Sequence, residues 1–550
     1  MARTTPGFDF LRRNLQVPVV SACFICALFR WLEHQSPTWA PAYLALPVIV
    51  LHILVRKLLK EYAEAAHAAR MDAQPVGTAI RSGALSILSS QRFDHRGGKV
   101  RPLVVEYGPM MFGINTVVTT SLEHMKIVLS TDPDSYVKDE SLYEAMGLVA
   151  SGRGYSTRLV YDMWKFHRTI TRPFFKRNRT FHLQLFTRHA QLVVSEIISG
   201  MKDHQSVDFA QNLVRHSTLN IATDLLFGTC VSCLSYPVVA NPNASPPFHP
   251  VTEFSEALLD LQEVVSERER LGWVWPLYEL YGDKAKAPVK VIGRHLAPIV
   301  QWALGRKMMR SAGVAYHTPH SHNIEDEYGK ESLLDHLVEL TSEPHLVQSA
   351  ILNTLIAGRA GTAITLNHIT SFLARYPAIF HRLRQEILEV VGPTKVPDGE
   401  DMSTLKYLRA VINETLRLMP QTQYMARESV TATTWPSPNP TDKRIYIPPR
   451  AKISLDISVL HTSKDLWGPD ADLFDPDRFL DWRYDKYVAP RSYIFLPFSS
   501  GPRACVGKDF PYDEISITVI ELLRRATGIK LSAAGTSFSF ESSRFPMDLS

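Results

Sequence analysis

The sequence predicts a mainly α-helical protein with small β-sheets. A long segment from His345 to about Arg375 has apolar residues at helical spacing, and Pro344 and Pro377 mark its boundaries. A second segment of this kind, residues 405–418, stops at Pro420. Runs typical of strands are short by comparison, so helices should supply most of the core.

Two pairs of short apolar runs are the expected strands. The runs of the first pair flank Gly108 and Pro109 and should form a hairpin early in the chain. The runs of the second pair flank Pro448 and Pro449 and are expected to pair with each other in the same way. The runs are residues 103–107, 111–120, 445–447 and 453–457.

Two apolar stretches near the N-terminus, residues 15–29 and 39–55, predict a membrane anchor. A bilayer core needs about 20 apolar residues, so the second is the better candidate for a span, and the first can lie partly in the interface. Basic residues outside both stretches predict that the outer ends face the cytoplasm. We therefore expect an anchor of one or two hydrophobic segments over residues 1–60 and one large domain over residues 61–550. The alternative, a cleaved signal peptide, lacks a small-residue cleavage site after the first stretch.

The composition argues against several classes of function. The 60 Lys and Arg exceed the 55 Asp and Glu by five, which is too small an excess to predict nucleic-acid binding. Five cysteines in 550 residues do not predict a disulfide framework. No flavin or nicotinamide fingerprint occurs, so electrons for redox chemistry must come from another protein. Metal binding by Cys23 with Cys26, by Cys230 with Cys233, or by the histidines at 317, 320 and 322 remains an alternative with weak support.

Residues 498–507 suggest a haem ligand. Cys505 stands in a loop that can present one thiolate to iron, and a thiolate donates electron density that favours cleavage of the O–O bond. Gly501 and Gly507 allow close approach of the backbone to the macrocycle and leave N–H groups to tune the sulfur. Phe498 can shield the sulfur from water, and Arg503 can pair with a haem propionate. The alternative is a buried free cysteine in a turn.

The pattern Phe-x-x-Gly-x-Arg-x-Cys-x-Gly in this loop resembles the signature of the cytochrome P-450 superfamily. The resemblance implies the P-450 fold behind an N-terminal anchor, with residues 61–550 as a haem-binding catalytic domain and haem b as cofactor. Residues 164–175, 355–359 and 465–479 look most like fungal microsomal enzymes related to alkane and fatty-acid hydroxylases. Such enzymes insert one atom of O2 into an apolar substrate, with electrons from NADPH delivered by NADPH-cytochrome P-450 reductase.

The resemblance also assigns a location and partners. It implies an endoplasmic reticulum membrane protein whose catalytic domain faces the cytosol and takes substrate from membrane lipid. The sequons at Asn178, Asn243 and Asn413 should then carry no sugar. The basic residues expected to contact the reductase are Arg503, Lys508, Arg524 and Arg525.

Two further motifs match the family in order and spacing. Glu414 and Arg417 are three residues apart, on one face of the helix that ends before Pro420, and Arg478 follows about sixty residues later. By resemblance these three residues form a buried structural network that supports the cysteine loop.

Three other residues are candidates for haem propionate binding. Trp164 and Arg168 are spaced i, i+4 in a Trp-x-x-x-Arg segment, so both side chains can reach one propionate. Arg427, just beyond the Glu-x-x-Arg helix, occupies the place of another propionate-binding arginine. Without the other motifs, Trp164 alone would be interpreted as a core aromatic residue.

The central helix departs from the family pattern. An acid followed by threonine normally delivers protons during oxygen activation, but this chain has Ala360 and Gly361 at those positions. Thr362 comes one residue later, and one residue on a helix is a rotation of about 100°. A local π-bulge could re-aim Thr362; otherwise water held at Gly358 and Gly361, or a hydroxyl on the substrate, must supply protons. The candidate catalytic residues are therefore Cys505, Gly358 and Thr362.

Two other function classes remain open. A haem-thiolate isomerase or dehydratase would use Cys505 without needing the acid and threonine, so Ala360 and Gly361 favour it. A non-catalytic haem-binding protein would bind the cofactor and turn over nothing. The substrate is not readable from the sequence, because lipids, terpenoids and other secondary metabolites all suit an apolar site.

Overall fold

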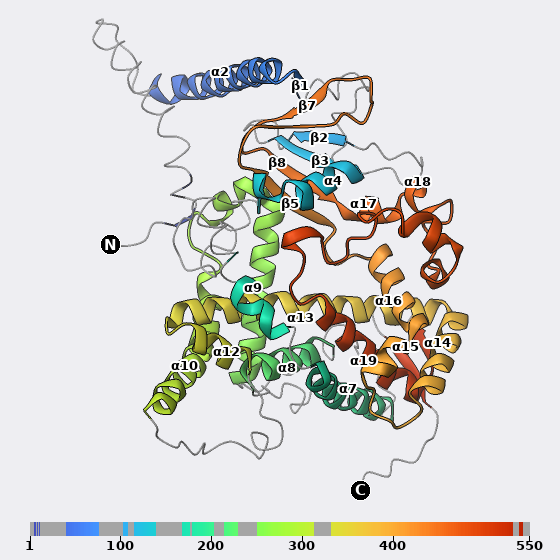
Figure 1. The fold of residues 1–550 in the computed structure, drawn as a ribbon. Coiled ribbons are helices and arrows are strands. Elements are labelled where there is room, and N and C mark those ends of the chain that lie inside the picture. The colour runs from blue at the N-terminus through green and yellow to red at the C-terminus, as the bar shows by residue number, and fades with distance from the viewer. Residues whose placement is uncertain are drawn as a thin grey trace, which may run out of the picture.

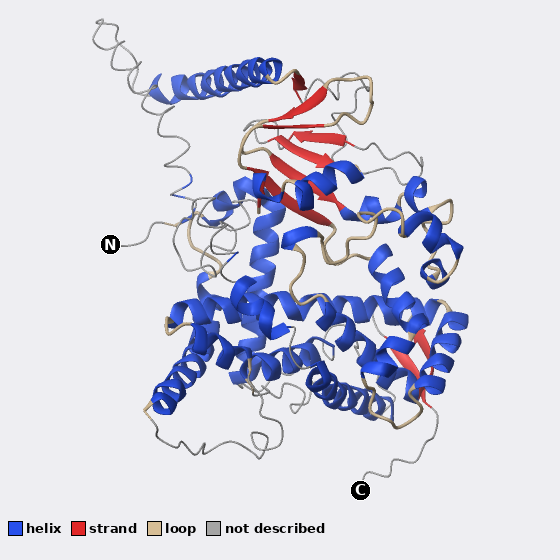
Figure 2. Ribbon diagram, in the orientation of Figure 1, coloured by secondary structure: helices blue, strands red, loops and turns tan. Residues whose placement is uncertain are grey.

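The computed structural model describes residues 40–75, 103–107, 115–138, 168–175, 179–202, 214–228, 250–312, 332–531 and 538–542, with a few isolated positions elsewhere. Within these residues helices predominate, and most strands gather at one end of the molecule (Figure 2). The prediction of a mainly helical protein with small sheets is confirmed.

Helices form the larger part of the molecule (Figure 1). The α-helices are α2 (Ala40–Arg70), α4 (Leu122–Lys126), α7 (Arg179–Lys202), α8 (Val214–Phe227), α9 (Pro250–Leu271), α10 (Lys286–Ser311), α12 (Leu333–Leu340), α13 (Pro344–Arg375), α14 (Pro377–Val390), α15 (Gly399–Thr404), α16 (Lys406–Leu418), α17 (Ile457–Thr462), α18 (Lys464–Trp467) and α19 (Asp509–Arg525). Shorter or irregular helices are η1 (Ile127–Thr131), η2 (Pro133–Ser135), η5 (Gly272–Glu279), η6 (Pro476–Phe479), η7 (Tyr484–Val488) and η8 (Gly501–Arg503).

The strands in the described part of the chain form three sheets. The five-stranded sheet has the order β2-β3-β8-β5-β4, the three-stranded sheet β1-β7-β6, and the two-stranded sheet β10-β9. The strands are β1 (Ala73–Pro75), β2 (Leu103–Tyr107), β3 (Asn115–Thr119), β4 (Tyr136–Val137), β5 (Tyr424–Ser429), β6 (Thr433–Trp435), β7 (Arg444–Ile447), β8 (Lys452–Asp456), β9 (Ala526–Leu531) and β10 (Phe538–Ser542).

The long helix α13 crosses the middle of the molecule (Figure 1). It begins with a proline in its first turn, where the missing N–H costs nothing, and it ends at Arg375, with Tyr376 as the cap before Pro377. Leu355 on one side belongs to the core between α8, α9, α10 and α12, and Leu366 belongs to the core between α14, α16 and α19. The two sequence-predicted helices around α13 and α16 are confirmed.

The strand predictions are partly wrong. β2 and β3 pair antiparallel with Leu103 opposite Thr119, as expected for the first hairpin. The two strands around Pro448 and Pro449 do not pair, because β7 joins β6 and β1 while β8 joins β3 and β5. Consecutive prolines remove two ladder donors, and Arg450 takes a positive φ of 60°, so the chain crosses from one sheet to the other.

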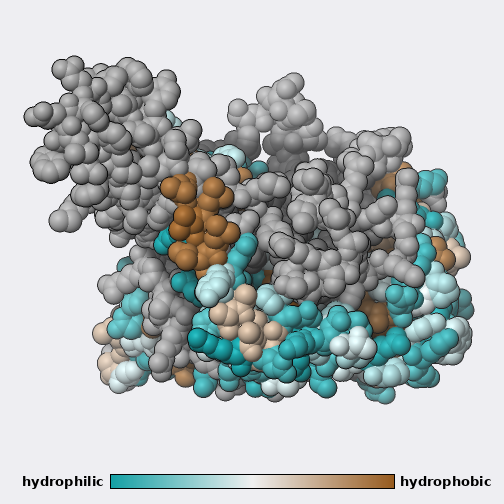
Figure 3. All heavy atoms as spheres, turned by 90° about the horizontal axis from the view of Figure 1, so that it is seen from above, coloured by the Kyte–Doolittle hydropathy of each residue, from teal (hydrophilic) through white to brown (hydrophobic). Residues whose placement is uncertain are grey.

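The expected anchor lies partly within the described residues. Helix α2 runs through the expected boundary at residue 60, and it carries exposed leucines at 51, 54, 58 and 59. Figure 3 shows hydrophobic side chains gathered on the upper face, where α2 lies. No helix in the described part of the chain is both long enough and apolar enough to cross a membrane. The first stretch, residues 15–29, lies outside the described residues.

Candidate active site

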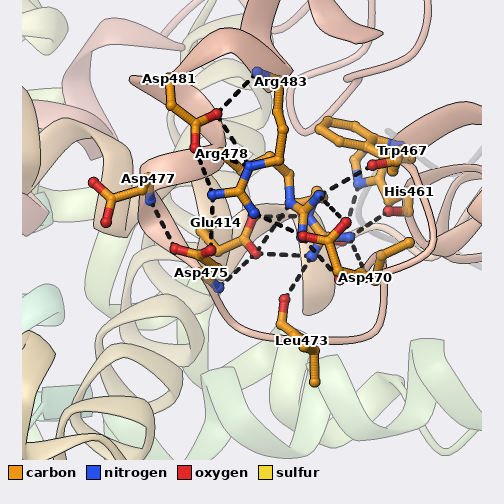
Figure 4. Close-up of polar contacts among 12 residues, drawn as sticks. Glu414, His461, Trp467, Asp470, Leu473, Asp475, Asp477, Arg478, Asp481 and Arg483 are labelled. Carbon is orange, nitrogen blue, oxygen red and sulfur yellow. Dashed lines mark hydrogen bonds and ion pairs between the residues drawn. The ribbon is translucent and has the colours of Figure 1, made fainter. Parts of the chain in front are cut away.

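The three residues expected to form a buried ionic network lie together between α16 and η6 (Figure 4). Arg417 donates two hydrogen bonds of 2.7 and 2.8 Å to the Glu414 carboxylate. The Arg478 Nε atom lies 3.6 Å from the Glu414 Oε1 atom, and all three side chains are fully buried. The Glu414 carboxylate thus lies against two guanidinium groups, and Arg478 has a second carboxylate partner in Asp470.

The two arginines also hold the segment that follows α18. Arg417 donates to the carbonyls of His461, Ala471 and Leu473 at 2.6 to 3.1 Å. Arg478 donates to the Asp470 carboxylate. Partial burial alone would raise the pKa of Asp470, but the hydrogen bonds from the Arg478 and Arg483 guanidinium groups lower it to about 2. This segment is therefore held by charge-assisted hydrogen bonds.

His461 joins this network to the chain that leads to Cys505. Its Nδ1 atom lies 3.2 Å from the Arg417 carbonyl oxygen, and its Nε2 atom accepts the Leu496 N–H at 2.9 Å. Complete burial and the nearby Arg417 charge lower the pKa of His461 to about 3, so the ring is neutral and can accept at Nε2. Sequence reasoning missed this residue, because a lone histidine in an apolar run carries no motif.

The cysteine loop runs from Phe498 through η8 into α19. The Cys505 side chain is exposed, its backbone N–H donates to the Phe498 carbonyl at 3.0 Å, and the Gly507 backbone N–H is hydrogen-bonded to its sulfur. The Phe498 ring packs 5.2 Å from the Tyr512 ring, between centroids. The loop therefore presents one thiol with a backbone donor aimed at the sulfur.

Gly501 is required by two features of this loop. Its φ is +71°, in the left-handed region, and a Cβ placed there would overlap the Leu129 backbone, with the carbonyl carbon only 2.8 Å away. The close approach that the structure shows at Gly501 is to η1, and its approach to the macrocycle stays a prediction. At Gly507 a Cβ would make only ordinary contact with the Phe175 ring, at 3.5 Å.

Cationic side chains gather around the Cys505 sulfur. The Cys505 side chain has accessible surface, yet desolvation by the surrounding protein raises the pKa of the thiol, and the Gly507 N–H, Arg168 and Lys138 oppose that rise. Lys138 has accessible surface, yet desolvation by the surrounding protein lowers the pKa of its ammonium group. The positive charges of Arg427 and Arg503 lower that pKa further. Sequence reasoning missed Lys138, because no pattern near residue 138 signals its approach to a cysteine far along the chain.

The predicted propionate-binding arginines contribute bonds to the protein itself. Arg168 donates to the Ala504 carbonyl at 2.6 Å, beside the cysteine. Arg503 donates to the carbonyls of Pro133 and Tyr136, which ties η8 to η2 and β4. Arg427 on β5 is buried. The fourth predicted residue, Trp164, lies outside the described residues.

Gly358 and Thr362, the candidate catalytic residues on α13, are four residues apart on one side of the helix, but they differ in exposure. Ala357 and Gly358 are exposed, and Ile364, about two turns further on, is 46% exposed. Thr362 is buried, and its hydroxyl bonds to the Gly358 carbonyl at 3.4 Å within α13 and to the Glu514 carboxyl of α19. It therefore lies beside, and not within, the open face of α13, which we define as Ala357, Gly358, Ala360, Gly361 and Ile364. In the described structure α13 is a regular helix here, without a π-bulge.

The other sequence candidates differ in exposure and in their place relative to this site. Lys508 is exposed, whereas Arg524 is buried and donates to Glu521 at 2.7 Å, so it does not fit the expected contact with a reductase. Arg525 is partly exposed. The described residues contain no cluster of metal-ligand type, and the paired cysteines and the histidines at 317, 320 and 322 fall outside them. Asn413 accepts a hydrogen bond from the Tyr512 hydroxyl, so its amide is engaged inside the fold.

The residues around Cys505 fit a haem. A thiol whose pKa the surrounding protein raises would still be deprotonated on binding a metal cation, and sulfur is a suitable ligand for haem iron. The cations Lys138, Arg168, Arg427 and Arg503 suit the two carboxylates that the macrocycle carries. The exposed small and apolar residues of α13 suit a flat apolar ring system and an apolar substrate.

The comparisons with known proteins agree with this chemistry. The family model described as Cytochrome P450 matches residues 105–527. The chain is 30% identical to Cytochrome P450 52E1 of Candida apicola over 83% of its own length and 84% of the relative. It is 25% identical to Cytochrome P450 52A1 of Candida tropicalis over 93% and 94%, respectively, and 26% identical to Cytochrome P450 monooxygenase pvhE of Talaromyces variabilis over 74% of each. The chain therefore belongs to the cytochrome P450 family of haem-binding oxidoreductases, and resembles its fungal members.

Proposed function

We propose that this protein is a haem-thiolate monooxygenase that inserts one atom of O2 into an apolar substrate, hydroxylating a lipid, a terpenoid or another secondary metabolite. Electrons come from NADPH through NADPH-cytochrome P-450 reductase. The observation that carries the proposal is the exposed Cys505 thiol with the Gly507 N–H at its sulfur and cations around it.

The chain's own residues hold and tune the cofactor. Cys505 would hold the haem iron through its sulfur, and the Gly507 N–H would stabilise negative charge on that sulfur and so adjust its electron donation. Lys138, Arg168 and Arg427 would neutralise the propionates, while Arg503 ties the loop to the N-terminal part of the domain. When bound, the haem supplies the activation of O2 and the transfer of one oxygen atom.

The open face of α13 supports an apolar substrate. Ala357 and Ile364 offer hydrocarbon surface, and Ala360 between them adds a small apolar side chain that is partly exposed. Apolar surface favours a substrate that partitions from membrane lipid, because its transfer out of water is favourable. Thr362 faces α19, so it is not proposed as the direct proton donor.

We further propose a membrane location. The exposed leucines of α2 and the apolar stretch at residues 15–29 support an anchor in the endoplasmic reticulum membrane, with the catalytic domain on the cytosolic side. Lys508 and Arg525 remain candidates for contact with the reductase, because both have accessible side chains close to the cysteine loop or α19.

One observation favours a second function. Neither the acid nor the threonine of the family pattern is present at Ala360 and Gly361, and an isomerase or dehydratase would need neither. Such an enzyme would turn over its substrate without NADPH and without reductase, which separates it from a monooxygenase.

The deciding experiment uses the full chain, purified with haem and reconstituted with a P-450 reductase. The ferrous carbonyl complex should have the strongly red-shifted Soret band of thiolate ligation. Product from a hydrophobic panel should require NADPH and should contain one oxygen atom from labelled O2. A histidine-type carbonyl spectrum, or product formation without NADPH, would contradict the proposal.

A further inference from the structure

The open face of α13 lacks polar side chains at the positions where the family has them. Ala360 and Gly361 are partly exposed, and their neighbours on this face are Ala357, Gly358 and Ile364. A side chain from outside the helix nevertheless brings a polar group to this face. That side chain is Gln421, in the link between α16 and β5.

Gln421 is bonded to two groups of α13. Its Nε2 atom donates to the Gly361 carbonyl and to the Thr365 hydroxyl. The Thr365 hydroxyl in turn donates to the same Gly361 carbonyl at 3.0 Å, and its side chain is buried. Three groups therefore share one compact set of hydrogen bonds, which fixes the direction of the Gln421 amide.

Gly361 and Gln421 are sterically complementary. A Cβ at residue 361 would overlap the Gln421 Oε1 atom and would lie 3.0 Å from its amide carbon and 3.3 Å from Nε2. The amide thus occupies the space that a larger residue at position 361 would need. The Gln421 amide can therefore occupy this position because residue 361 is a glycine.

The same geometry leaves an acceptor on the open face. Both hydrogen bonds that Gln421 makes with described residues use Nε2, so the carbonyl oxygen Oε1 has no partner among them. An amide oxygen accepts a hydrogen bond and cannot donate a proton. A hydroxyl group on a ligand is the complementary donor, and around it the face offers only apolar surface.

We propose that Gln421 is a specificity-determining residue whose Oε1 atom accepts a hydrogen bond from a substrate hydroxyl, so that the preferred substrates are apolar molecules that already carry one hydroxyl. This inference rests on the proposed function, because it names the substrate class of that same site. A neutral hydrogen bond of this kind changes a dissociation constant by about threefold to tenfold.

The test measures ligand binding and does not depend on turnover. Haem-loaded full-length protein is titrated with matched pairs that differ by one hydroxyl, such as tetradecane and 1-tetradecanol or a cyclic terpene and its alcohol, and dissociation constants are taken from the shift of the Soret band. The wild-type protein should bind at least one alcohol about threefold to tenfold more tightly than its hydrocarbon. Gln421→Leu should remove that preference and leave hydrocarbon binding unchanged.

Gln423→Leu is the matched control, because Gln423 lies two residues further along the same link and its side chain is exposed. This variant should keep the preference. Gly361→Ala tests the same preference for alcohols without changing residue 421. The new Cβ should displace the Gln421 amide and so weaken that preference. Haem content and the carbonyl spectrum check that each variant is folded.

The outcomes separate the two proposals. Equal binding of alcohols and hydrocarbons by the wild-type protein, or an unchanged preference in both Gln421→Leu and Gly361→Ala, would overturn the role of Gln421. A preference that depends on Gln421 in a protein that never consumes NADPH would support the binding role and contradict the proposed monooxygenase function.

Discussion

The hydroxyl of Thr362 on α13 is hydrogen-bonded to the carboxyl of Glu514 on α19, and both side chains are buried. Burial raises the pKa of Glu514 to about 8 even though the Thr362 bond acts in the opposite direction. The carboxyl is therefore mostly neutral at pH 7 and has a proton to share. This pair links the central helix to the helix that follows Cys505.

The first prediction concerns Glu514→Gln. The pKa of Glu514 is about 8 in the folded state and 4.5 ordinarily. Between these two pH values the carboxyl is therefore protonated in the folded state and ionised in the unfolded state. The stability that the neutral carboxyl provides is full below pH 4.5 and is lost as the pH rises to about 8. Because glutamine does not titrate, the variant should become more stable than wild type across this window, by at most on the order of 5 kcal/mol. Thermal midpoints at several pH values measure this, and a constant difference would contradict it.

Thr362→Val should lower stability and leave coupling of NADPH use to product unchanged. Valine keeps the shape but removes the hydroxyl that Glu514 uses, which should cost about 1 to 3 kcal/mol because a buried polar group loses its partner. Thr354→Val is the control, because the Thr354 hydroxyl bonds only within α13 among the described contacts. Increased peroxide formation in Thr362→Val on every substrate would instead make Thr362 a proton relay.

Glu414→Gln should be among the most destabilising single changes in the chain. It removes the only carboxylate that contacts both Arg417 and Arg478 within the described network, and uncompensated buried charge costs about 3 to 5 kcal/mol. Glu267→Gln, which alters an exposed ion pair with Lys284, should cost no more than about 1 kcal/mol. Chemical unfolding followed by fluorescence compares the two, and similar losses would refute the role of the network.

Gly501→Ala should prevent formation of the cysteine loop. The new Cβ would overlap the Leu129 backbone, and the positive φ of +71° disfavours alanine even without that overlap. Gly399→Ala is the control, because nothing lies within 4 Å of a Cβ there. The ratio of haem to protein after purification measures the effect, and a normal ratio in Gly501→Ala would show that the loop can move away from η1.

Lys138→Met should release haem faster than wild type. Loss of one charge-assisted contact, worth about 1.5 to 3 kcal/mol, corresponds to roughly a tenfold or greater increase in the release rate. Lys126→Met is the control, because Lys126 is an exposed residue on α4. Transfer of haem to an excess of apomyoglobin gives the rates. Equal rates for the two variants would mean that Lys138 does not reach a propionate.

The elements that could be predicted best from the sequence are those that residues close together in the chain specify. The helix around residues 406–418 follows from its own apolar spacing and from Pro420, and the first hairpin follows from residues on either side of its turn. The network of Glu414, Arg417 and Arg478 could be predicted because these residues belong to motifs that occur in a fixed order along the chain.

Features set by tertiary contacts could not be predicted in this way. The strands on either side of Pro448 and Pro449 are adjacent in sequence, but each has one partner that is distant in sequence. β7 pairs with β1, and β8 pairs with β3. Lys138, His461 and Gln421 contact groups that the chain brings close only when it folds. A single sequence carries no local pattern for such contacts, because their partners lie at no fixed spacing.

The contacts of the cysteine loop also set a time order for biosynthesis. Arg503 bonds to carbonyls 367 and 370 positions earlier in the chain, and Gly501 rests on Leu129. At about 5 to 20 residues per second, the ribosome finishes the two sides of this contact roughly 20 to 75 s apart. The early segment can therefore form this contact only after the cysteine loop has been synthesised. A haem site built on Cys505 can be completed only after both segments have been made.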